Sequence, residues 1–246
     1  MKIVKRIGFI SLIVVLVAVL GFVGWARLNR YPAMPTAQAL AQAANHQRGW
    51  LVFEPAQPSG AGFIFYPGGL VDAAAYAPLA RALADKGVLT VITPVPLELA
   101  VLNVNAADGV AAAFPQVKVW AIGGHSLGGA MAAQYLSTHP DSVNMIHGLV
   151  LWGAHLSGGI DVARLPIRVL SVYGTLDGVS PAGLSDADRR AHLPADVQLV
   201  AIEGGNHGMF GDYGPQKGDN PARIDAASAQ QQIATATAAM ILSLRR

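Results

Sequence analysis

Residues 117–139 read VKVWAIGGHSLGGAMAAQYLSTH, and this stretch decides the fold. It opens with an apolar, β-branched run that is typical of a buried strand, and from Leu127 it continues with the small residues of a tightly packed helix. The change from strand to helix falls at Ser126, inside the pentapeptide GHSLG at 124–128, a G-x-S-x-G pattern. The stretch therefore predicts a strand, a sharp turn and a helix, with a serine hydroxyl at the turn.

A serine on such a turn is a candidate nucleophile. Glycines on either side leave room for a strained backbone, and the N–H of Leu127 at the helix N-terminus would point toward a developing oxyanion. The alternative is a glycine-rich turn in which Ser126 only caps the helix. Because the pattern is flanked by the strand and the helix that catalysis requires, we interpret Ser126 as a nucleophile.

Composition limits the class of protein. The chain has 246 residues, enough for one large core and a tail, with 52% hydrophobic and only 13% charged residues. This balance predicts a membrane segment, strands buried on both faces, or both. The chain contains no cysteine, which excludes disulfides, thiolate metal sites and a cysteine nucleophile.

An apolar segment near the N-terminus, residues 7–26, carries no charge and is long enough to cross a bilayer. Basic residues flank it, with a small excess on the N-terminal side, which predicts an uncleaved single-pass anchor and an extracytoplasmic domain. The alternative is a signal peptide cut near Ala37-Gln38-Ala39. The basic residues are Lys2, Lys5, Arg6, Arg27 and Arg30.

These five cations exceed the formal net charge of +2, so the rest of the chain is net acidic. A nucleic-acid-binding domain needs a basic face on its folded part, and nucleic acid is therefore excluded as a partner. The expected partners are a lipid bilayer and a small molecule. We predict an anchor at residues 1–30, a spacer or short helix at 31–48, and a catalytic domain at 49–246.

Within that domain, short apolar runs alternate with runs of helical period. This alternation predicts an α/β fold with a mostly parallel sheet and crossover helices on both faces. Besides the strand before Ser126, the predicted strands are residues 50–53, 62–66, 88–93, 145–152, 168–173 and 197–202. The predicted helices span the residues between Asp72 and Gly87, Val104 to Phe114, and the C-terminal residues from about Ser228.

A serine nucleophile needs a base, and the base needs an orienting acid. Such groups gather at the carboxyl ends of parallel strands. His207 directly follows the last predicted strand and Asp177 follows the one before it, so the chain order Ser, Asp, His fits this type of site. The alternatives are a loop histidine and a turn-forming Asp-Gly, with Asp212 as a substitute acid. We assign no chemistry to His125 but expect it to line the site.

A second oxyanion donor is expected from the loop YPGGL at 66–70, after the strand 62–66. Glycines there let a backbone N–H face the site without a side chain in the way. We favour Gly69, followed by Leu70. The alternative is an ordinary Pro-Gly turn.

Taken together, these motifs resemble the α/β-hydrolase superfamily, and specifically a compact bacterial group of unassigned substrate related to the dienelactone hydrolases. The resemblance covers residues 50 to the C-terminus. Its motifs are FYPGG at 65–69 with Tyr76, GGHSLGG at 123–129, YGTLD at 173–177, and GGNH at 204–207 with FGDYG at 210–214.

The resemblance implies a serine hydrolase without a cofactor or a catalytic metal, in which Ser126 is the nucleophile, His207 the base and Asp177 its partner. Pro67 is a departure, because many esterases have a histidine there. The short connection at 153–167 predicts a minimal lid and an open pocket, and the polar loop 211–221 is expected to shape the entrance, with its acids forming turns.

The sequence thus predicts a membrane-anchored serine hydrolase of small carboxylic esters, lactones or thioesters. The expected fold is an α/β-hydrolase fold preceded by one N-terminal transmembrane helix. Two alternatives use the same triad for acyl transfer or peptide cleavage. A third is a non-catalytic binding module that has kept the fold.

Overall fold

The computed structural model describes residues 2–181 and 184–244. The chain divides into two compact units, one ending at Arg30 and the other comprising Tyr31–Arg246. The first unit is a single helix, and the second contains the sheet, the remaining helices and all the predicted site residues.

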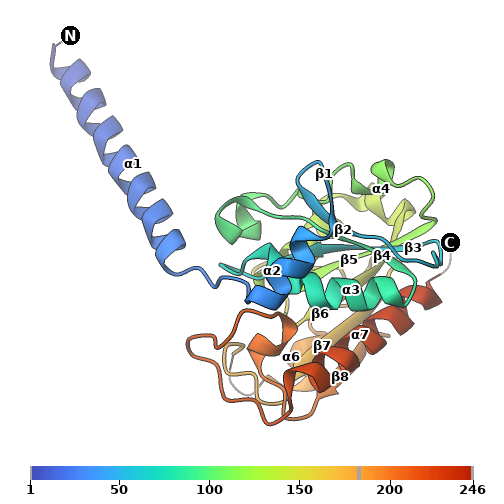
Figure 1. Cartoon of the computed structure of the whole chain (residues 1–246). Helices are drawn as coiled ribbons and strands as arrows, with labels where there is room; N and C mark the ends of the chain where they lie inside the picture. The colour runs from blue at the N-terminus through green and yellow to red at the C-terminus, as the bar shows by residue number, and fades with distance from the viewer. Residues whose placement is uncertain (1, 182–183, 245–246) are drawn as a thin grey trace. The chain divides into compact units, whose positions relative to one another are not determined.

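The first unit is helix α1, Lys2–Leu28 (Figure 1). Its segment Ser11–Leu28 has a mean hydropathy of 2.2, and only 6% of it is buried. Exposed apolar side chains along a helix of this length are suited to a bilayer core of about 30 Å. A signal sequence near an N-terminus has the same length and composition.

The second unit is built on an eight-stranded sheet within the described residues, with the strand order β1-β2-β4-β3-β5-β6-β7-β8. Strands β1 and β2 pair antiparallel, β2 also runs antiparallel to β4, and the strands from β4 to β8 are parallel. The strands are β1 Asn45–Gln47, β2 Trp50–Phe53, β3 Ala61–Tyr66, β4 Val88–Ile92, β5 Val119–His125, β6 Ile146–Trp152, β7 Arg168–Gly174 and β8 Gln198–Ile202.

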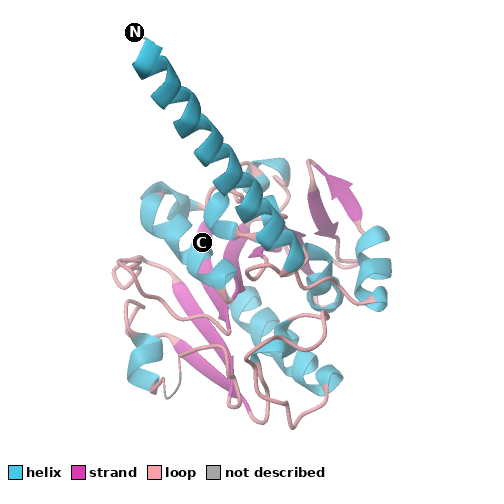
Figure 2. Ribbon diagram, turned by 90° about the vertical axis from the view of Figure 1, so that its left-hand side faces the viewer, coloured by secondary structure: helices cyan, strands magenta, loops and turns pink. Residues whose placement is uncertain are grey.

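Helices cover both faces of this sheet (Figure 2). One face packs against α2 (Pro35–Gln42), α3 (Ala77–Asp85) and α7 (Ala226–Ser243), and α3 and α7 lie side by side there (Figure 1). The other face packs against α4 (Val110–Ala113) and α5 (Leu127–Thr138). Every residue of β3, β4 and β5 is buried, which explains why these strands are apolar throughout rather than alternating.

The predicted strands and the crossover architecture are confirmed, with boundaries that differ by one or two residues. Asp72, which precedes the first predicted helix, caps the start of this segment, because its carboxylate accepts a hydrogen bond from the Ala74 N–H. A 3₁₀ turn, η1 (Ala73–Tyr76), follows and leads into α3. The connection at 153–167 contains no helix, as predicted. The only helix between β7 and β8 in the described residues is the short α6, Asp186–Arg190.

The helix predicted from Val104 to Phe114 is wrong, since only its last part is helical, as α4. The hydroxyl of Tyr66 donates to the Val104 carbonyl at 2.6 Å and accepts from the Ala107 N–H at 2.8 Å. A side chain from β3 therefore binds the Val104 carbonyl, which a helix would have paired with the Asp108 N–H, and that N–H donates to the Asn105 carbonyl instead. The left-handed φ of +75° at the residue before α4, Gly109, then sets where the helix begins.

Residues 31–48, which the sequence suggests as a spacer or short helix, form α2 and β1 inside the second unit. Ala37 on α2 is fully buried in the core. We call residues 31–36 the strap. Its first residue, Tyr31, pairs as a parallel bridge with Val71, directly after the loop expected to hold the oxyanion.

The strap also contacts the loop that follows His207. The N–H of Met34 donates to the Asp212 carbonyl at 2.8 Å, and the Thr36 hydroxyl donates to the Asp212 carboxylate at 2.7 Å. The chain just after α1 is thus hydrogen bonded to two of the loops at the carboxyl end of the sheet.

Candidate active site

Ser126 occupies a strained turn between β5 and α5. Its backbone has φ 52° and ψ −123°, a conformation that costs a residue with a side chain about 1–3 kcal/mol. Neighbouring glycines make the turn possible, because a Cβ on Gly124 or Gly128 would collide with the carbonyl oxygen of Tyr66. The Ser126 N–H donates to the Trp152 carbonyl at 2.9 Å and fixes the turn against β6. The predicted strand-turn-helix motif is therefore present.

The structure brings Asp177 and His207 together. His207 Nδ1 lies 2.8 Å from Asp177 Oδ2, and the exposed fractions of the two side chains are 1% and 2%. A carboxylate accepts hydrogen bonds, so Nδ1 is the donor of this bond, and the lone pair of the neutral form of the ring is on Nε2. Burial alone raises the pKa of Asp177, but the hydrogen bond and charge of His207, together with hydrogen bonds from Ser180, lower it to about 2.

Ser126 and His207 line the same cavity, which has a volume of about 270 Å³. His207 Nε2 is buried and has no hydrogen-bond partner among the described residues. Ser126 Oγ is therefore not bonded to it here, although both residues line one cavity. In unliganded sites this bond is often long and tightens when substrate binds.

The loop after β3 leaves one of its N–H groups available. Gly68 N–H donates to the Tyr76 hydroxyl at 2.9 Å, and Leu70 N–H donates to the Glu98 carbonyl at 2.7 Å. The N–H of Gly69 has no acceptor within the described part of the chain. Of the two residues that the sequence offers as the second oxyanion donor, the free N–H thus belongs to Gly69.

Gly69 lies beside the start of α5. A Cβ built on it would be 3.3 Å from a side-chain methyl of Leu127. As the first residue of α5, Leu127 directs its N–H out of the helix, and this group too has no backbone acceptor in the residues that the structure describes. Two unpaired N–H groups therefore lie on neighbouring segments next to Ser126.

His125 does not line the cavity, contrary to expectation, because its side chain is buried behind the site. Its Nδ1 lies 2.9 Å from the Tyr76 hydroxyl, which accepts the Gly68 N–H, and its ring lies 4.5 Å from the His207 ring. Burial, aided by the charge of His207, lowers the pKa of His125 well below 6.5, so the ring is neutral. The Tyr76–His125 pair thus supports both the loop of Gly68 and the ring of His207, a role that the sequence analysis missed.

The polar loop 211–221 contains two aspartates with different contacts. Asp212, the substitute acid of the sequence analysis, accepts the Thr36 hydroxyl and is not the hydrogen-bond partner of His207. Asp219, interpreted as a turn former, accepts the backbone N–H of His207 at 3.1 Å. Sequence reasoning missed this contact, because nothing in the local pattern GDN distinguishes it from a turn.

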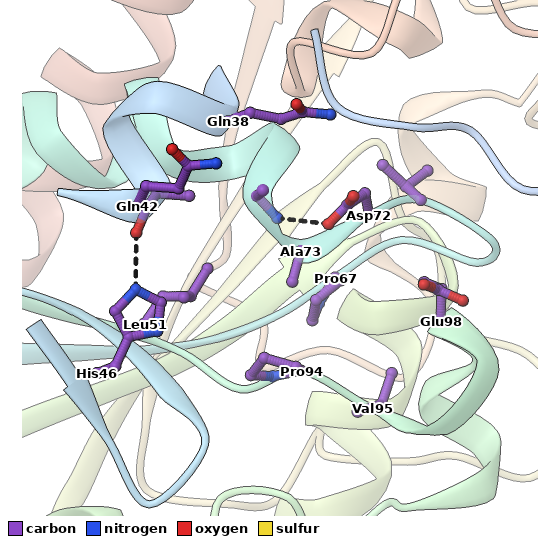
Figure 3. A pocket seen from close by; sticks show the side chains of 13 residues that line it. Gln38, Gln42, His46, Leu51, Pro67, Asp72, Ala73, Pro94, Val95 and Glu98 are labelled. Atoms are coloured by element: carbon purple, nitrogen blue, oxygen red, sulfur yellow. Dashed lines mark hydrogen bonds between the residues drawn. The ribbon is translucent and has the colours of Figure 1, made fainter. Parts of the chain in front are cut away.

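A second cavity, of about 310 Å³, lies between α2 and the loop at residues 66–70 (Figure 3). Figure 3 shows Gln38 and Gln42 of α2 at one part of its rim and Val95 and Glu98, from the segment after β4, at another. Pro67 is part of its wall, but Ser126, Asp177 and His207 are not among its lining residues. Within residues 2–181 and 184–244, no three His, Asp or Glu side chains form a group that could hold a metal ion.

Solved structures share this architecture. Esterase 2 of Thermogutta terrifontis, phosphoramylated by tabun, superimposes with a TM-score of 0.53 at 16% identity, over 82% of this chain and 94% of its own. A monoacylglycerol lipase of Paleococcus ferrophilus gives 0.56 at 14% identity, over 79% and 98%. A dienelactone hydrolase of Anabaena variabilis gives 0.56 at 16% identity, over 80% and 92%.

No curated protein sequence matches the chain. A family model described as the alpha/beta hydrolase family matches residues 62–232, a range that contains Ser126, Asp177 and His207. This match spans well over half of the chain and agrees with the sheet order and the strand-turn-helix motif. The chain therefore belongs to the alpha/beta hydrolase family.

Proposed function

We propose that the protein is a serine hydrolase that cleaves a small carboxylic ester, lactone or thioester through an acyl-enzyme on Ser126. One observation carries this proposal: His207 is bonded through Nδ1 to Asp177 at 2.8 Å, its Nε2 has no partner among the described residues, and His207 and Ser126 line one cavity. This is the arrangement that an imidazole base needs in order to take a proton from a serine hydroxyl.

In the first step, Ser126 Oγ attacks the substrate carbonyl carbon and its proton passes to His207 Nε2. The negative charge that develops on the carbonyl oxygen is stabilised by the N–H groups of Leu127 and Gly69. The tetrahedral intermediate collapses, and His207 returns the proton to the leaving alcohol or thiol. Water, deprotonated by His207, then attacks the acyl-enzyme and releases the carboxylic acid.

The cavity supports a small and uncharged acyl group. Its volume of about 270 Å³ lies at or below the lower end of the usual range for ligand pockets. No Lys, Arg, Asp or Glu is among its lining residues, which are mostly small or apolar, such as Ala130, Gly153 and Ala154. The absence of a helix in residues 153–167 leaves the entrance without a lid from that connection.

We also propose that α1 is an uncleaved single-pass membrane anchor with the catalytic unit on the extracytoplasmic side. The excess of basic residues before the apolar segment supports this orientation. Cleavage after Ala39 would cut through α2, whose Ala37 is fully buried, and this supports retention of the segment.

The decisive experiment is labelling with a fluorophosphonate, which reacts only with an activated serine, followed by mass-spectrometric mapping of the modified residue. We expect one adduct, on Ser126, and hydrolysis of p-nitrophenyl acetate that falls at least about 10³-fold in Ser126→Ala. Activity should decline as the acyl chain of the ester lengthens.

A folded protein that is not labelled would instead be a binding module. A rate of ester cleavage that Ser126→Ala leaves unchanged would remove Ser126 from the mechanism. Product analysis with added alcohols, amines and peptides separates hydrolysis from acyl transfer and from peptide cleavage.

A further inference from the structure

One aspartate, Asp219, joins the two loops that carry Asp177 and His207. Its Oδ1 accepts the N–H of Gly178 at 3.0 Å and the N–H of His207 at 3.1 Å, and its Oδ2 accepts the N–H of Gly208 at 2.8 Å. Gly178 directly follows the acid and Gly208 directly follows the base. A single carboxylate therefore binds backbone N–H groups of both loops, one next to the acid and two at or next to the base.

Asn220 extends the same junction, and we call residues 219–220 the clasp. The Asn220 N–H donates to Asp219 Oδ1 at 2.9 Å, and its side-chain amide donates to the Leu176 carbonyl at 3.1 Å. Its carbonyl accepts the side-chain amide of Asn206 at 2.8 Å. The clasp thus contacts the residues just before and just after both Asp177 and His207.

The clasp fits closely against the loop of the acid. A Cβ added to Gly178 would lie 2.7 Å from Asn220 N and 2.8 Å from Asn220 Nδ2. Gly178 does not have a positive φ, so the close approach of the clasp, rather than backbone conformation, is what excludes a side chain there.

Asp177 and His207 are held in place by different hydrogen bonds. Asp177 is oriented within its own loop, since its Oδ1 accepts the N–H groups of Val179 and Ser180 at 2.9 and 2.8 Å. The backbone N–H of His207 has the clasp as its hydrogen-bond acceptor. Asp219 therefore links the backbones of both loops next to the acid and the base, in addition to the direct bond from the Leu176 N–H to the Gly205 carbonyl at 2.8 Å.

We propose that Asp219 is a positioning residue that fixes His207 against Asp177 and so sets the direction of Nε2 toward Ser126. This inference rests on the proposed function, because its catalytic consequence requires His207 to be the base. Positioning matters at this scale, since a displacement of about 1 Å can reduce a rate about 10²-fold.

A carboxylate is well matched to this role. Its two oxygens accept four N–H groups here and need no proton of their own. In Asp219→Asn, an NH₂ group must replace one oxygen and face an N–H donor. The clasp then loses at least one hydrogen bond and gains a repulsive donor–donor contact.

The experiment compares Asp219→Asn and Gly178→Ala with a matched control, Asp225→Asn. Asp225 also accepts a backbone N–H, that of Ser228 at 2.8 Å, but this bond caps α7 and involves neither the loop of Asp177 nor that of His207. Measurements are kcat and KM for p-nitrophenyl acetate, the thermal midpoint, and the ¹H–¹⁵N spectrum of the His207 ring.

We expect Asp219→Asn and Gly178→Ala to lower kcat about 10- to 100-fold with KM changed less than about 3-fold. The ring resonance of His207 should shift in both variants and stay unchanged in Asp225→Asn. In an Asp177→Asn background, Asp219→Asn should have an effect below about 3-fold, because the pair that it positions is already broken.

The proposal is overturned if Asp219→Asn keeps both kcat and the His207 ring shifts, or if its full effect persists in the Asp177→Asn background. If the wild-type protein is not labelled by fluorophosphonate, the proposed function fails instead. The ring shifts of His207 still test the clasp in that case, since they report hydrogen bonding without turnover.

Discussion

The two halves of the candidate site are held in place by different forces. Ser126 is positioned by sterics within β5, α5 and their neighbours, where glycines let the backbone approach the Tyr66 carbonyl. The Asp177–His207 pair is positioned by hydrogen bonds that backbone N–H groups of its two loops donate to Asp219, a residue on another loop. Damage to the first half should therefore affect folding, and damage to the second should affect mainly catalysis.

The loop at residues 66–70, which carries Gly69, is held in place both by packing in the core and by side-chain hydrogen bonds. Its Gly68 is held by Tyr76 from the adjacent turn η1, and that hydroxyl is in turn bonded to His125, next to the nucleophile. Side-chain hydrogen bonds act here, as they do on the acid–base side, but they are buried within the core. Changes in this loop should affect stability and rate together.

The largest effect is expected from breaking the acid–base side directly. Asp177→Asn should lower kcat about 10³- to 10⁴-fold, because the amide donates to Nδ1 and stabilises the wrong tautomer of His207. Steady-state kinetics with p-nitrophenyl acetate measure this loss. Asp212→Asn is the matched control and should stay within about 3-fold, since Asp212 bonds Thr36 instead. Equal losses in both variants would contradict the assignment of Asp177 as the acid that orients His207.

Substitutions around Ser126 should lower the stability of the fold. Gly128→Ala places a methyl group against the Tyr66 and Pro67 carbonyls, and we expect a loss of about 2–4 kcal/mol in the free energy of unfolding. Urea denaturation followed by circular dichroism measures it. Gly24→Ala makes the same change in α1, where nothing lies within 4 Å, and should leave the stability of the second unit unchanged. A stable Gly128→Ala would show that the turn can relax.

Tyr76→Phe tests the loop at residues 66–70. It removes one hydroxyl and leaves the Gly68 N–H and His125 Nδ1 buried without partners. We expect kcat to fall about 10- to 100-fold and stability to fall by about 1–3 kcal/mol. Tyr135→Phe is the control, because that hydroxyl bonds Asp108 at the other end of α5, and its kcat should be near the wild-type value. Loss of stability without loss of kcat would make Tyr76 purely structural.

The smallest effect concerns pH. The pKa of Asp177 in the folded protein is about 2, below the unfolded value of about 3.9. Its ionised form therefore stabilises the fold above about pH 4, and this contribution disappears as the pH falls toward 2. We expect the stability difference between wild type and Asp177→Asn to shrink by about 1–2 kcal/mol from pH 5 to pH 2. A difference that is constant with pH would mean that the carboxylate is not preferentially stabilised on folding.

The comparison between the two halves also explains what the sequence could predict. Strands, the turn at Ser126 and the placement of Asp177 and His207 at strand ends follow from local patterns and from the rule that parallel strands share a carboxyl edge. The helix predicted from Val104 failed because the hydroxyl of Tyr66, 38 residues earlier, pairs its backbone. No local pattern contains that contact.

Asp219 escaped prediction for the same reason. Its partners are backbone N–H groups 41, 12 and 11 residues away, which any residue except proline supplies. A hydrogen bond to a backbone N–H cannot be recognised from the identity of the donor residue, whereas a bond to a side chain requires a particular residue type. His125 and Tyr76 could have been paired from their positions beside the nucleophile and the loop, but the 2.9 Å contact depends on how η1 packs.

The strap has a practical consequence for anyone preparing this protein. A soluble recombinant version that begins at Gly49, where the compact motifs start, would lack Tyr31, Met34 and the buried Ala37, and it would leave the carbonyl of Leu70 and the N–H of Asp72 open to solvent. Removing only α1, with Tyr31 as the first native residue, keeps these contacts. By the same reasoning, a protease that cuts between Leu28 and Tyr31 would release the second unit with these contacts intact, whereas a cut within residues 31–36 would separate part of the strap from it.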